Sequence, residues 1–348
     1  MKKSLLALAV LGAFAGVASA QSTVTLFGVV DQSVNYQKSN GKRLITVDSN
    51  QLSSNRLGFK GIEDLGSGLK AGFWLEAGMT NDTGAGAATG GGLQFNRRST
   101  ISLISNAGEI RIGRDYTPTF WNTVLYDVYG ANGIGEGVDL TAYGVAPAGG
   151  AGALGSGATS TVRANNSVAY WLPASAGGFY GRAMVAASEG VSGGKYYGAS
   201  INWAGAGADV GGSYGVTKII GGPDYKVYNV GASYDFAVAK IYAFYNVSKW
   251  EPRQLKTFEI SAGIPIGASA INASYTHATY SGSTAGAYIG KGDQFSLQYI
   301  YNLSKRTALY GTVAHIANKN GASFSFGDVA VGASQKADGA NVGVRHSF

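Results

Sequence analysis

The residues of this chain that could act chemically are mainly arginines and lysines at strand spacing. In Arg56-Leu57-Gly58-Phe59-Lys60 the two cations lie on one face of an extended segment, and Leu57 and Phe59 lie on the other, because side chains alternate with a period of two. A cationic face beside water raises the local concentration of anions. The pattern therefore predicts electrostatic selection of solutes by a strand wall, not bond-making chemistry.

A second basic face is predicted for the segment that starts at Arg163. Side chains two apart form a polar face and those between them an apolar one; the first set is Arg163, Asn165, Ser167 and Ala169, and the second is Ala164, Val168, Tyr170 and Leu172. A lipid-facing charge on a strand costs about 2–4 kcal/mol at the membrane midplane. In a membrane-crossing strand, alternation therefore places Arg163 on the side facing water.

The adjacent pair Arg97-Arg98 leaves two alternatives open. Alternation with Thr100 and Ser102 favours Arg98 on the inner face, whereas a β-bulge would turn Arg97 inward. Both arginines are therefore candidates for the basic wall.

One connection, from Asp115 to Arg163, is much longer than the others. Its first part is aromatic and acidic, with Phe120, Trp121, Tyr126, Asp127, Tyr129, Glu136 and Asp139, and residues 149–157 are nearly all small. A flexible exterior loop would suit the glycine-rich part, but long loops are often functional, and the aromatic residues favour a loop whose residues 115–145 fold inward. Loop acids opposite wall arginines would create a field across a narrow passage, or would only fix the loop by salt bridges.

The strands that must hold these residues alternate with two kinds of connection. Seven are short, near 65–68, 106–108, 174–178, 204–207, 235–238, 265–267 and 303–307, and eight are longer, near 38–54, 80–94, 115–163, 188–195, 219–224, 248–256, 279–292 and 317–338. Seven tight turns on one side join eight hairpins, hence sixteen strands. This asymmetry is typical of an all-β, antiparallel transmembrane β-barrel with short periplasmic turns and long outer loops. A barrel of this size leaves an aqueous channel.

The composition and the N-terminus agree with an exported membrane barrel. The 348 residues include 54 glycines, 21 tyrosines, 6 prolines and no cysteine, so turns and long uninterrupted strands, not disulfides, must support the fold. Residues 1–20 have the charged start, apolar middle and Ala18-Ser19-Ala20 end of a signal peptide. We therefore expect residues 21–348 to form one barrel domain.

The chain ends inside an alternating stretch, in which Val342, Val344, His346 and Phe348 share one face. An unpaired terminal strand would be a sticky edge. Pairing it with the first strand, which begins near Val24, would close the barrel and abolish both edges.

Together these stretches resemble the Gram-negative general porins of the betaproteobacterial and neisserial type, over the whole expected mature chain. The motifs that carry the resemblance lie at 22–28, 55–71, 97–99 (Arg97-Arg98-Ser99), 111–115 (Arg111-Ile112-Gly113-Arg114-Asp115), 163–167, 301–310 and 344–348. The resemblance implies a homotrimeric outer-membrane channel, surrounded by lipid and lipopolysaccharide, through which small hydrophilic solutes and ions diffuse.

Within that family the chain is similar to the anion-selective porins, and this similarity implies particular site residues. Arg56, Arg97 and Arg163 match the arginines of the pore constriction, and Glu76 and Asp127 match its acids, with Lys60 and Arg98 as further basic candidates. The final Phe348 resembles the signal read by the outer-membrane assembly machinery. The insert at 148–158 departs from the motif stretches and leaves the outer path of the third loop open.

Other functions compete with a general channel. A channel specific for sugars or organic acids could use a path of aromatic residues, such as Trp74, Phe120, Trp121 and Tyr126, and a surface adhesin could use the long loops. An enzyme would need a base near a nucleophile, but His277, His315 and His346 have no such partners at recognisable spacing. Basic residues are scattered, and no phosphate-binding or metal motif stands out, so we expect neither nucleic acid nor a cofactor.

Overall fold

The computed structural model of the chain describes residues 23–86, 92–140, 161–188, 195–218, 223–282 and 290–348. The expected signal peptide at 1–20 lies outside the described residues, and so does the insert at 148–158.

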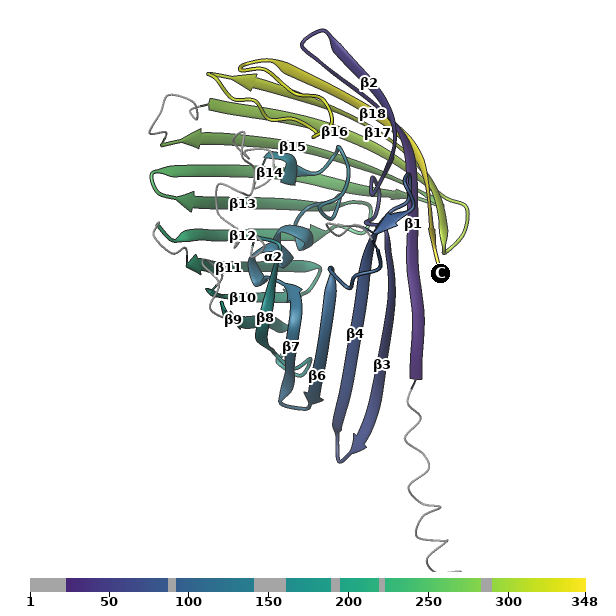
Figure 1. The fold of residues 1–348 in the computed structure, drawn as a ribbon, viewed down its shortest axis with the longest axis vertical. Helices are drawn as coiled ribbons and strands as arrows, with labels where there is room; N and C mark the ends of the chain where they lie inside the picture. The colour runs from purple at the N-terminus through teal and green to yellow at the C-terminus, as the bar shows by residue number, and fades with distance from the viewer. Residues whose placement is uncertain (1–22, 87–91, 141–160, 189–194, 219–222, 283–289) are drawn as a thin grey trace, which may run out of the picture.

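Antiparallel strands make up most of the described chain, and they follow one another around a ring (Figure 1). The strands are β1 Thr23–Ser39, β2 Lys42–Ser49, β3 Arg56–Gly66, β4 Leu69–Thr80, β5 Ala85–Gly86, β6 Arg98–Ser105, β7 Gly108–Tyr116, β8 Arg163–Trp171, β9 Phe179–Ala186, β10 Lys195–Gly205, β11 Ala208–Lys218, β12 Tyr225–Asp235, β13 Lys240–Trp250, β14 Arg253–Ile266, β15 Ser269–Ser281, β16 Gly290–Asn302, β17 Thr307–Lys319 and β18 Lys336–Ser347. Two helices interrupt this series, α2 Pro118–Leu125 and the 3₁₀ helix η1 Gly137–Leu140.

No helix in the described part of the chain has the length and apolar character needed to cross a membrane.

Sixteen of the strands close into a barrel, as predicted. The first strand, β1, pairs with β3 over Thr23 to Val29 and with β18 over Val29 to Ser39. The two further strands are extensions of this wall: β2 pairs with the outer half of β1, and β5 pairs with two residues of β4. The ring therefore has no free edge where the first and last strands meet.

The closure is completed by the last residue of the chain. The Gly28 N–H donates to the Phe348 carbonyl at 3.0 Å, and the Phe348 N–H donates to the Gly28 carbonyl at 3.1 Å. The Phe348 ring lies over Gly28, where a Cβ atom would collide with it. The predicted pairing of the final strand with the first is thus confirmed, and only glycine leaves room for the terminal ring.

Alternation separates the two faces of the wall. On β1, Val24 and Leu26 are exposed on the outside, whereas Asp31 and Asn35 are almost fully buried on the inside. An apolar exterior with a polar interior is the arrangement that a strand wall in lipid requires.

All seven predicted short turns are present at one end of the barrel, called here the turn end; the opposite end is the loop end. One predicted long connection was wrong. Residues 38–54 do form a long connection between the barrel strands β1 and β3, and it holds β2; the β1–β2 hairpin turns at Asn40 and Gly41, which both have positive φ, 49° and 74°, as a two-residue type I′ turn requires. Residues 248–256 hold only a two-residue turn, because β13 continues to Trp250 and β14 begins at Arg253.

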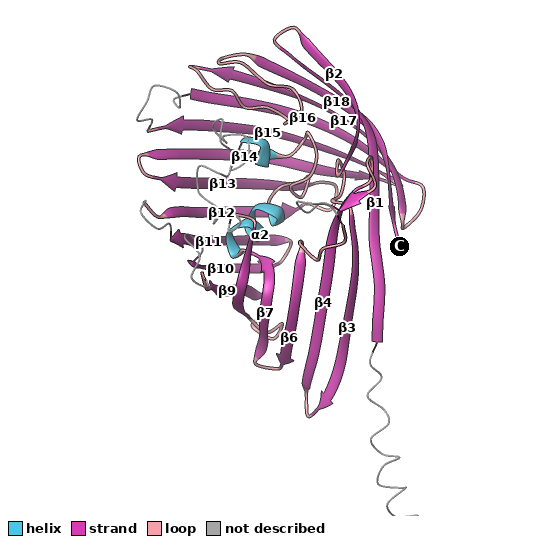
Figure 2. Cartoon of the chain, viewed as in Figure 1, coloured by secondary structure: helices cyan, strands magenta, loops and turns pink. Residues whose placement is uncertain are grey.

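The predicted inward fold of the third loop is confirmed for residues 117–140. Figure 2 shows both helices enclosed by the strands. Thr117 caps α2 by accepting the Phe120 N–H, and Pro118 occupies the first turn, where no amide donor is needed. The helix α2 contacts β9 to β12, and η1 contacts β15 and β16. This inward segment, residues 117–140, therefore lines the far wall and narrows the interior.

Replacing the last residue tests the closure. We expect Phe348→Ala to lower the yield of folded barrel in lipid vesicles, because loss of the half-buried ring removes about 1 kcal/mol of apolar contact from the last strand to pair. Heat-modifiable electrophoretic mobility measures the folded fraction. Phe236→Ala, at an exposed turn aromatic, is the control; an equal loss in both variants would contradict a special role for the closing ring.

Candidate functional site

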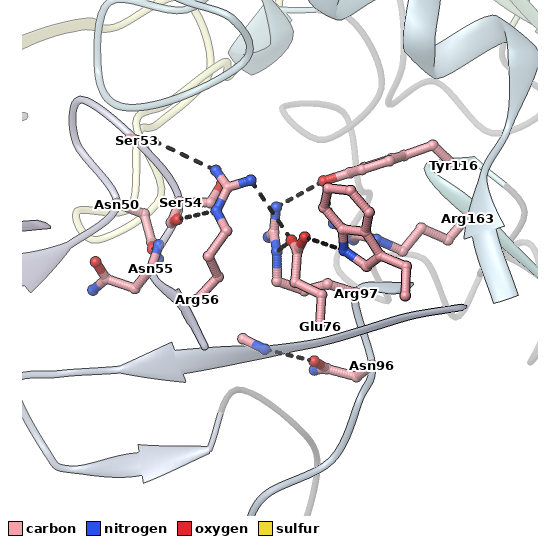
Figure 3. Close-up of polar contacts among 12 residues, drawn as sticks. Asn50, Ser53, Ser54, Asn55, Arg56, Glu76, Asn96, Arg97, Tyr116 and Arg163 are labelled. Carbon is pink, nitrogen blue, oxygen red and sulfur yellow. Dashed lines mark hydrogen bonds and ion pairs between the residues drawn. The ribbon is translucent and has the colours of Figure 1, made fainter. Parts of the chain in front are cut away.

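One carboxylate holds two guanidinium groups on the inner wall (Figure 3). Glu76 Oε1 lies 2.6 Å from Arg97 Nε and 3.6 Å from Arg56 Nη1. Its other oxygen, Oε2, accepts a hydrogen bond from Trp74 Nε1 at 3.0 Å. The Glu76 side chain is 5% exposed, whereas that of Arg56 is 26% exposed. The carboxylate is therefore enclosed by its partners, and the cations keep contact with the interior space.

Tyr116 links the third arginine to this group. Its hydroxyl oxygen accepts hydrogen bonds from Arg97 Nη2 and from Arg163 Nη2, both at 2.7 Å. The Arg163 guanidinium also lies 4.3 Å above the Tyr116 ring, a distance suited to a cation–π contact. Arg56, Arg97 and Arg163 form what we call the arginine cluster. Its three positive charges exceed the single negative charge of Glu76.

The hydrogen-bonded segment between β2 and β3 fixes the position of Arg56. Between β2 and β3, the fully buried Asp31 carboxylate accepts the N–H groups of Leu52 at 2.7 Å and Ser53 at 2.5 Å. The amide oxygen of Asn55 accepts the Asp31 N–H, and Arg56 Nε donates to the Ser54 carbonyl at 2.9 Å. The backbone that precedes Arg56 is thus held by the first strand.

Both members of the Arg97-Arg98 pair point to the interior. Strand β6 begins at Arg98, which pairs with Glu76 and shares the inner face with Thr100, as alternation predicts. Arg97 precedes the strand, so alternation does not apply to it, and its N–H donates to the Glu76 carbonyl at 3.0 Å. The two alternatives were not exclusive: Arg97 joins the arginine cluster, and Arg98 lies on its turn-end side.

The predicted alternation around Arg163 was wrong at its first residues. The β7–β8 register shifts between Gly113 and Asp115, and Asn166 has a φ of 53°, which marks a β-bulge. The extra residue places Ala164 inside, opposite Asp115, while Asn165 is exposed and accepts a hydrogen bond from Arg114. Arg163 reaches the arginine cluster from the end of the strand by stacking on Tyr116, not by sharing the face of Ser167.

A cavity of about 380 Å³ separates the arginine cluster from the inward segment on the loop-end side. Arg97 and Arg163 line it from the wall, and Asn132, Glu136 and Asp139 line it from the segment. Burial raises the pKa of the Glu136 and Asp139 carboxyls well above their usual values, and the neighbouring acids add to the effect. The raised pKa values make these two carboxyls weaker counter-charges to the arginines than freely exposed acids would be.

Asp127 does not line the cavity beside the arginine cluster, although it was expected opposite the arginines. It is 4% exposed, and its oxygens accept the N–H groups of Tyr129 at 2.8 Å and Ala131 at 2.9 Å. Glu259 on β14 shares a hydrogen bond with it. Asp127 therefore shapes the inward segment and fastens it to the far wall. The loop carboxyls that face the arginines are Glu136 and Asp139.

The remaining basic candidate, Lys60, lies on the turn-end side of the arginine cluster. Its Nζ is 4.9 Å from the Trp74 ring and 5.4 Å from the Phe27 ring. Lys60, Trp74 and Arg98 line a second cavity, of about 310 Å³. The arginine cluster thus stands between two cavities, one toward the loops and one toward the turns.

The aromatic residues considered for a sugar path have different packing partners. Phe120 stacks on Tyr116 at 5.5 Å, and Trp121 packs against Tyr116 and Trp171, each at 6.2 Å. Tyr126, on the inward segment, is 1% exposed and packs against Phe244. Trp74 donates a hydrogen bond to Glu76. These four aromatic residues therefore support the loop and the arginines and do not form one stripe.

Tyr116 is the functional residue that sequence reasoning missed. It directly follows the motif at 111–115 and ends β7, and a tyrosine at the end of a strand with arginines on neighbouring strands was the available signal. Its role depends on Arg97 and Arg163 meeting at one oxygen, which spacing along the chain does not reveal.

Comparisons with known proteins agree with this geometry. A family model described as Gram-negative porin matches residues 7–321. Outer membrane porin protein 32 of Delftia acidovorans is 37% identical over 372 residues, covering all of both chains. The major outer membrane protein P.IB of Neisseria meningitidis is 37% identical over 134 residues, 36% of each chain. The solved anion-selective porin from Comamonas acidovorans superposes with a TM-score of 0.81 at 33% identity, covering 94% of this chain and all of that one.

Removing the central carboxylate should destabilise the site. We expect Glu76→Gln to lower the free energy of unfolding by about 2–3 kcal/mol, because two close guanidiniums lose their counter-charge and breaking a largely buried ion pair is costly. Denaturant unfolding in detergent, followed by tryptophan fluorescence, measures the change. The control is Glu63→Gln, an exposed residue of β3, and equal losses in the two variants would count against the arrangement described here.

The attachment of the inward segment should weaken as pH rises. Burial raises the pKa of Asp127 from its usual 3.8 to about 6, so the folded segment binds a proton more tightly than the detached one. The resulting stabilisation is complete below about pH 4 and is lost as pH rises through about 6, a change on the order of 3 kcal/mol.

Hydrogen exchange of residues 117–140 between pH 4 and pH 8, corrected for intrinsic rates, measures this attachment. Asp127→Asn should reduce the pH dependence, to which Glu136 and Asp139 also contribute, and Asp64→Asn, at the exposed end of β3, should leave it unchanged. Exchange protection that increases with pH in the native protein would have the wrong sign for a raised pKa.

Proposed function

The chain belongs to the Gram-negative porin family, and from this membership we propose that its barrel is an anion-preferring diffusion channel of the outer membrane. Porins form water-filled channels there, so the turn end faces the periplasm and the loop end faces outward. Small hydrophilic solutes and ions cross it passively. The proposal concerns selectivity and the residues responsible for it.

The observation that carries the proposal is the charge excess at the arginine cluster. Arg56 and Arg97 pair with the Glu76 carboxylate, and the Tyr116 hydroxyl joins Arg97 to the third guanidinium, that of Arg163. The loop carboxyls across the cavity, Glu136 and Asp139, have raised pKa values. A passage walled by protein strengthens the field of fixed charges, so anions are attracted there and cations are repelled.

The position of the arginine cluster supports a role as the pore constriction. It lies between the two cavities, with Arg97 and Arg163 lining one and Lys60 and Arg98 lining the other. A solute that passes from the loop end to the turn end along these cavities meets the guanidiniums. The similar protein of known structure is itself described as anion-selective. We assign Arg56, Arg97 and Arg163 to the constriction, Glu76 as their counter-ion and Tyr116 as a positioning residue.

We extend the proposal to assembly and to the alternatives. Residues 1–20 act as a signal peptide, Phe348 is read by the outer-membrane assembly machinery, and three copies associate in the membrane with lipid and lipopolysaccharide around them. Cross-linking in outer-membrane vesicles tests the trimer: the largest cross-linked species should contain three chains. The relatives are named as porins, and we propose that this chain is likewise a channel and not an enzyme. Adhesion by the outer loops would be compatible with transport.

Selectivity is measured by the reversal potential in a potassium chloride gradient across a planar bilayer. We expect chloride to be preferred, less strongly at high salt because ions screen the fixed charges. Arg163→Glu should lower the chloride-to-potassium permeability ratio by about an order of magnitude, since it reverses a charge worth about 1 kcal/mol. Cation preference in the native channel would overturn the proposal.

Two further variants test whether selectivity depends on how the arginines are positioned and on where the charge lies. Tyr116→Phe keeps every charge but removes the oxygen that Arg97 and Arg163 share, and we expect a loss of roughly two- to threefold in the permeability ratio. Arg43→Glu, in the exposed β1–β2 hairpin, reverses a charge away from the passage and should change the ratio little. A larger effect at Arg43 than at Arg163 would place selectivity in the outer loops instead.

A further inference from the structure

The cavity on the turn-end side of the arginine cluster has one charged and one apolar half. It measures about 310 Å³ and lies against β3, β4, β6 and β7. Lys60, Arg98 and Arg111 line its charged half together with the Glu109 carboxylate, Thr23 and Thr25 of β1 add hydroxyl groups, and Ile62, Ile104 and Trp74 form its apolar half. The interior of an aqueous barrel is ordinarily polar, so isoleucines on that face call for an explanation.

The cations of this cavity differ in how fully they are neutralised. Arg111 is paired with Glu109 at 2.8 Å and with Asp115 at 2.5 Å. Arg98 lies 3.8 Å from Asp115. Within the described residues Lys60 faces the rings of Trp74 and Phe27 and not a carboxylate. Lys60 and Arg98 therefore retain positive charge for an incoming anion, and both lie against the same Trp74 ring, Arg98 at 4.4 Å.

The apolar half follows from the strand register. Ile62 is two residues after Lys60 on β3 and pairs with Gly72 on β4, so it shares the inner face and is 52% exposed there. Ile104 is two residues after Ser102 on β6, and its Cδ1 would lie 3.6 Å from a Cβ at Gly72. The missing side chain at Gly72 thus leaves open space between the two isoleucines.

We propose that this cavity is a binding site for monocarboxylates with an apolar body, aromatic acids in particular. The carboxylate lies between Lys60 and Arg98, and the ring or branched chain lies over Gly72 against Ile62 and Ile104. The inference rests on the proposed function, because the solute reaches the site through the channel. It adds to that function a preference among anions, which the arginine cluster alone would not provide.

The two halves exclude simpler ligands. Chloride would gain from the cations but not from the isoleucines, and a neutral sugar would gain nothing from the charge of Lys60 and Arg98. A small cavity with a few directed charges and an apolar lining is the usual form of a ligand site. The volume suits one ring with one charged group.

The test compares benzoate with acetate as blockers of chloride current through single channels in planar bilayers, added from the turn end. Both carry the same charge, so the difference reports the apolar half. We expect benzoate to reach half-block at a concentration roughly tenfold lower than acetate, from burial of much of one ring face. Equal half-block concentrations for the two acids would overturn the inference.

Two substitutions locate the effect. Gly72→Val fills the open space without changing charge, and it should bring the half-block concentration of benzoate to within about twofold of that of acetate. Lys60→Gln should raise the half-block concentration of both acids by roughly three- to tenfold. If Gly72→Val does not insert into bilayers, Lys60→Gln still tests the site.

The matched control is Lys240→Gln on the opposite wall. Lys240 lies on the inner face of β13, because Tyr242, two residues on, pairs with the buried Ser233 and Ser261; its Nζ is 5.0 Å from the Tyr242 ring. We expect this variant to leave benzoate block unchanged, and a shift equal to that of Lys60→Gln would refute the location. The reversal potential in potassium chloride is recorded in the same membranes. Cation preference there would defeat the proposed function, whereas chloride preference without benzoate discrimination would defeat only this inference.

Discussion

The structure depends on pairing the first strand with the last. A backbone amide left unpaired in lipid costs several kcal/mol, so a sheet of this kind must close. The hydrogen bonds between Gly28 and Phe348 complete that closure at the turn end, and β1 bridges β3 and β18 along its length. Closure in turn sets the width of the barrel. With sixteen strands the interior is too wide for wall side chains to fill, and the inward segment occupies part of it.

The inward segment makes the interior asymmetric. The acids of the segment lie on one side of the interior together with the wall acid Glu259. Among them, Asp127 accepts hydrogen bonds from two backbone amides. The arginines lie on the other side, around Glu76. Burial raises the pKa of the loop carboxyls Glu136 and Asp139, and partial exposure leaves the guanidiniums in contact with water. A positive passage therefore arises although basic and acidic residues are both present, because the two kinds of charge have different access to solvent.

Alternation along the chain predicted most of the wall correctly, and its failures have local causes. Arg56, Lys60 and Arg98 lie on the predicted inner face because their strands are regular around them. Arg163 and Asn165 do not follow the pattern, since the bulge at Asn166 adds one residue. Asn40-Gly41 is a hairpin signal that could have been recognised, whereas the place of Asp127 outside the cavity beside the arginines follows from the path of the loop through the interior.

The amino-acid sequence by itself determined the strand pattern, the seven turns, the barrel with its inward loop and the arginines that could serve it. These features follow from a period of two, from turn composition and from family motifs, all of which are local along the chain. Only the tertiary structure decided that Arg97 and Arg163 meet at the Tyr116 hydroxyl, that Glu136 and Asp139 and not Asp127 face them, and that Ile62 and Ile104 flank Gly72. Each of these depends on register between strands or on the course of a loop across a closed ring, and such contacts join residues whose separation in sequence carries no signal of their distance in space.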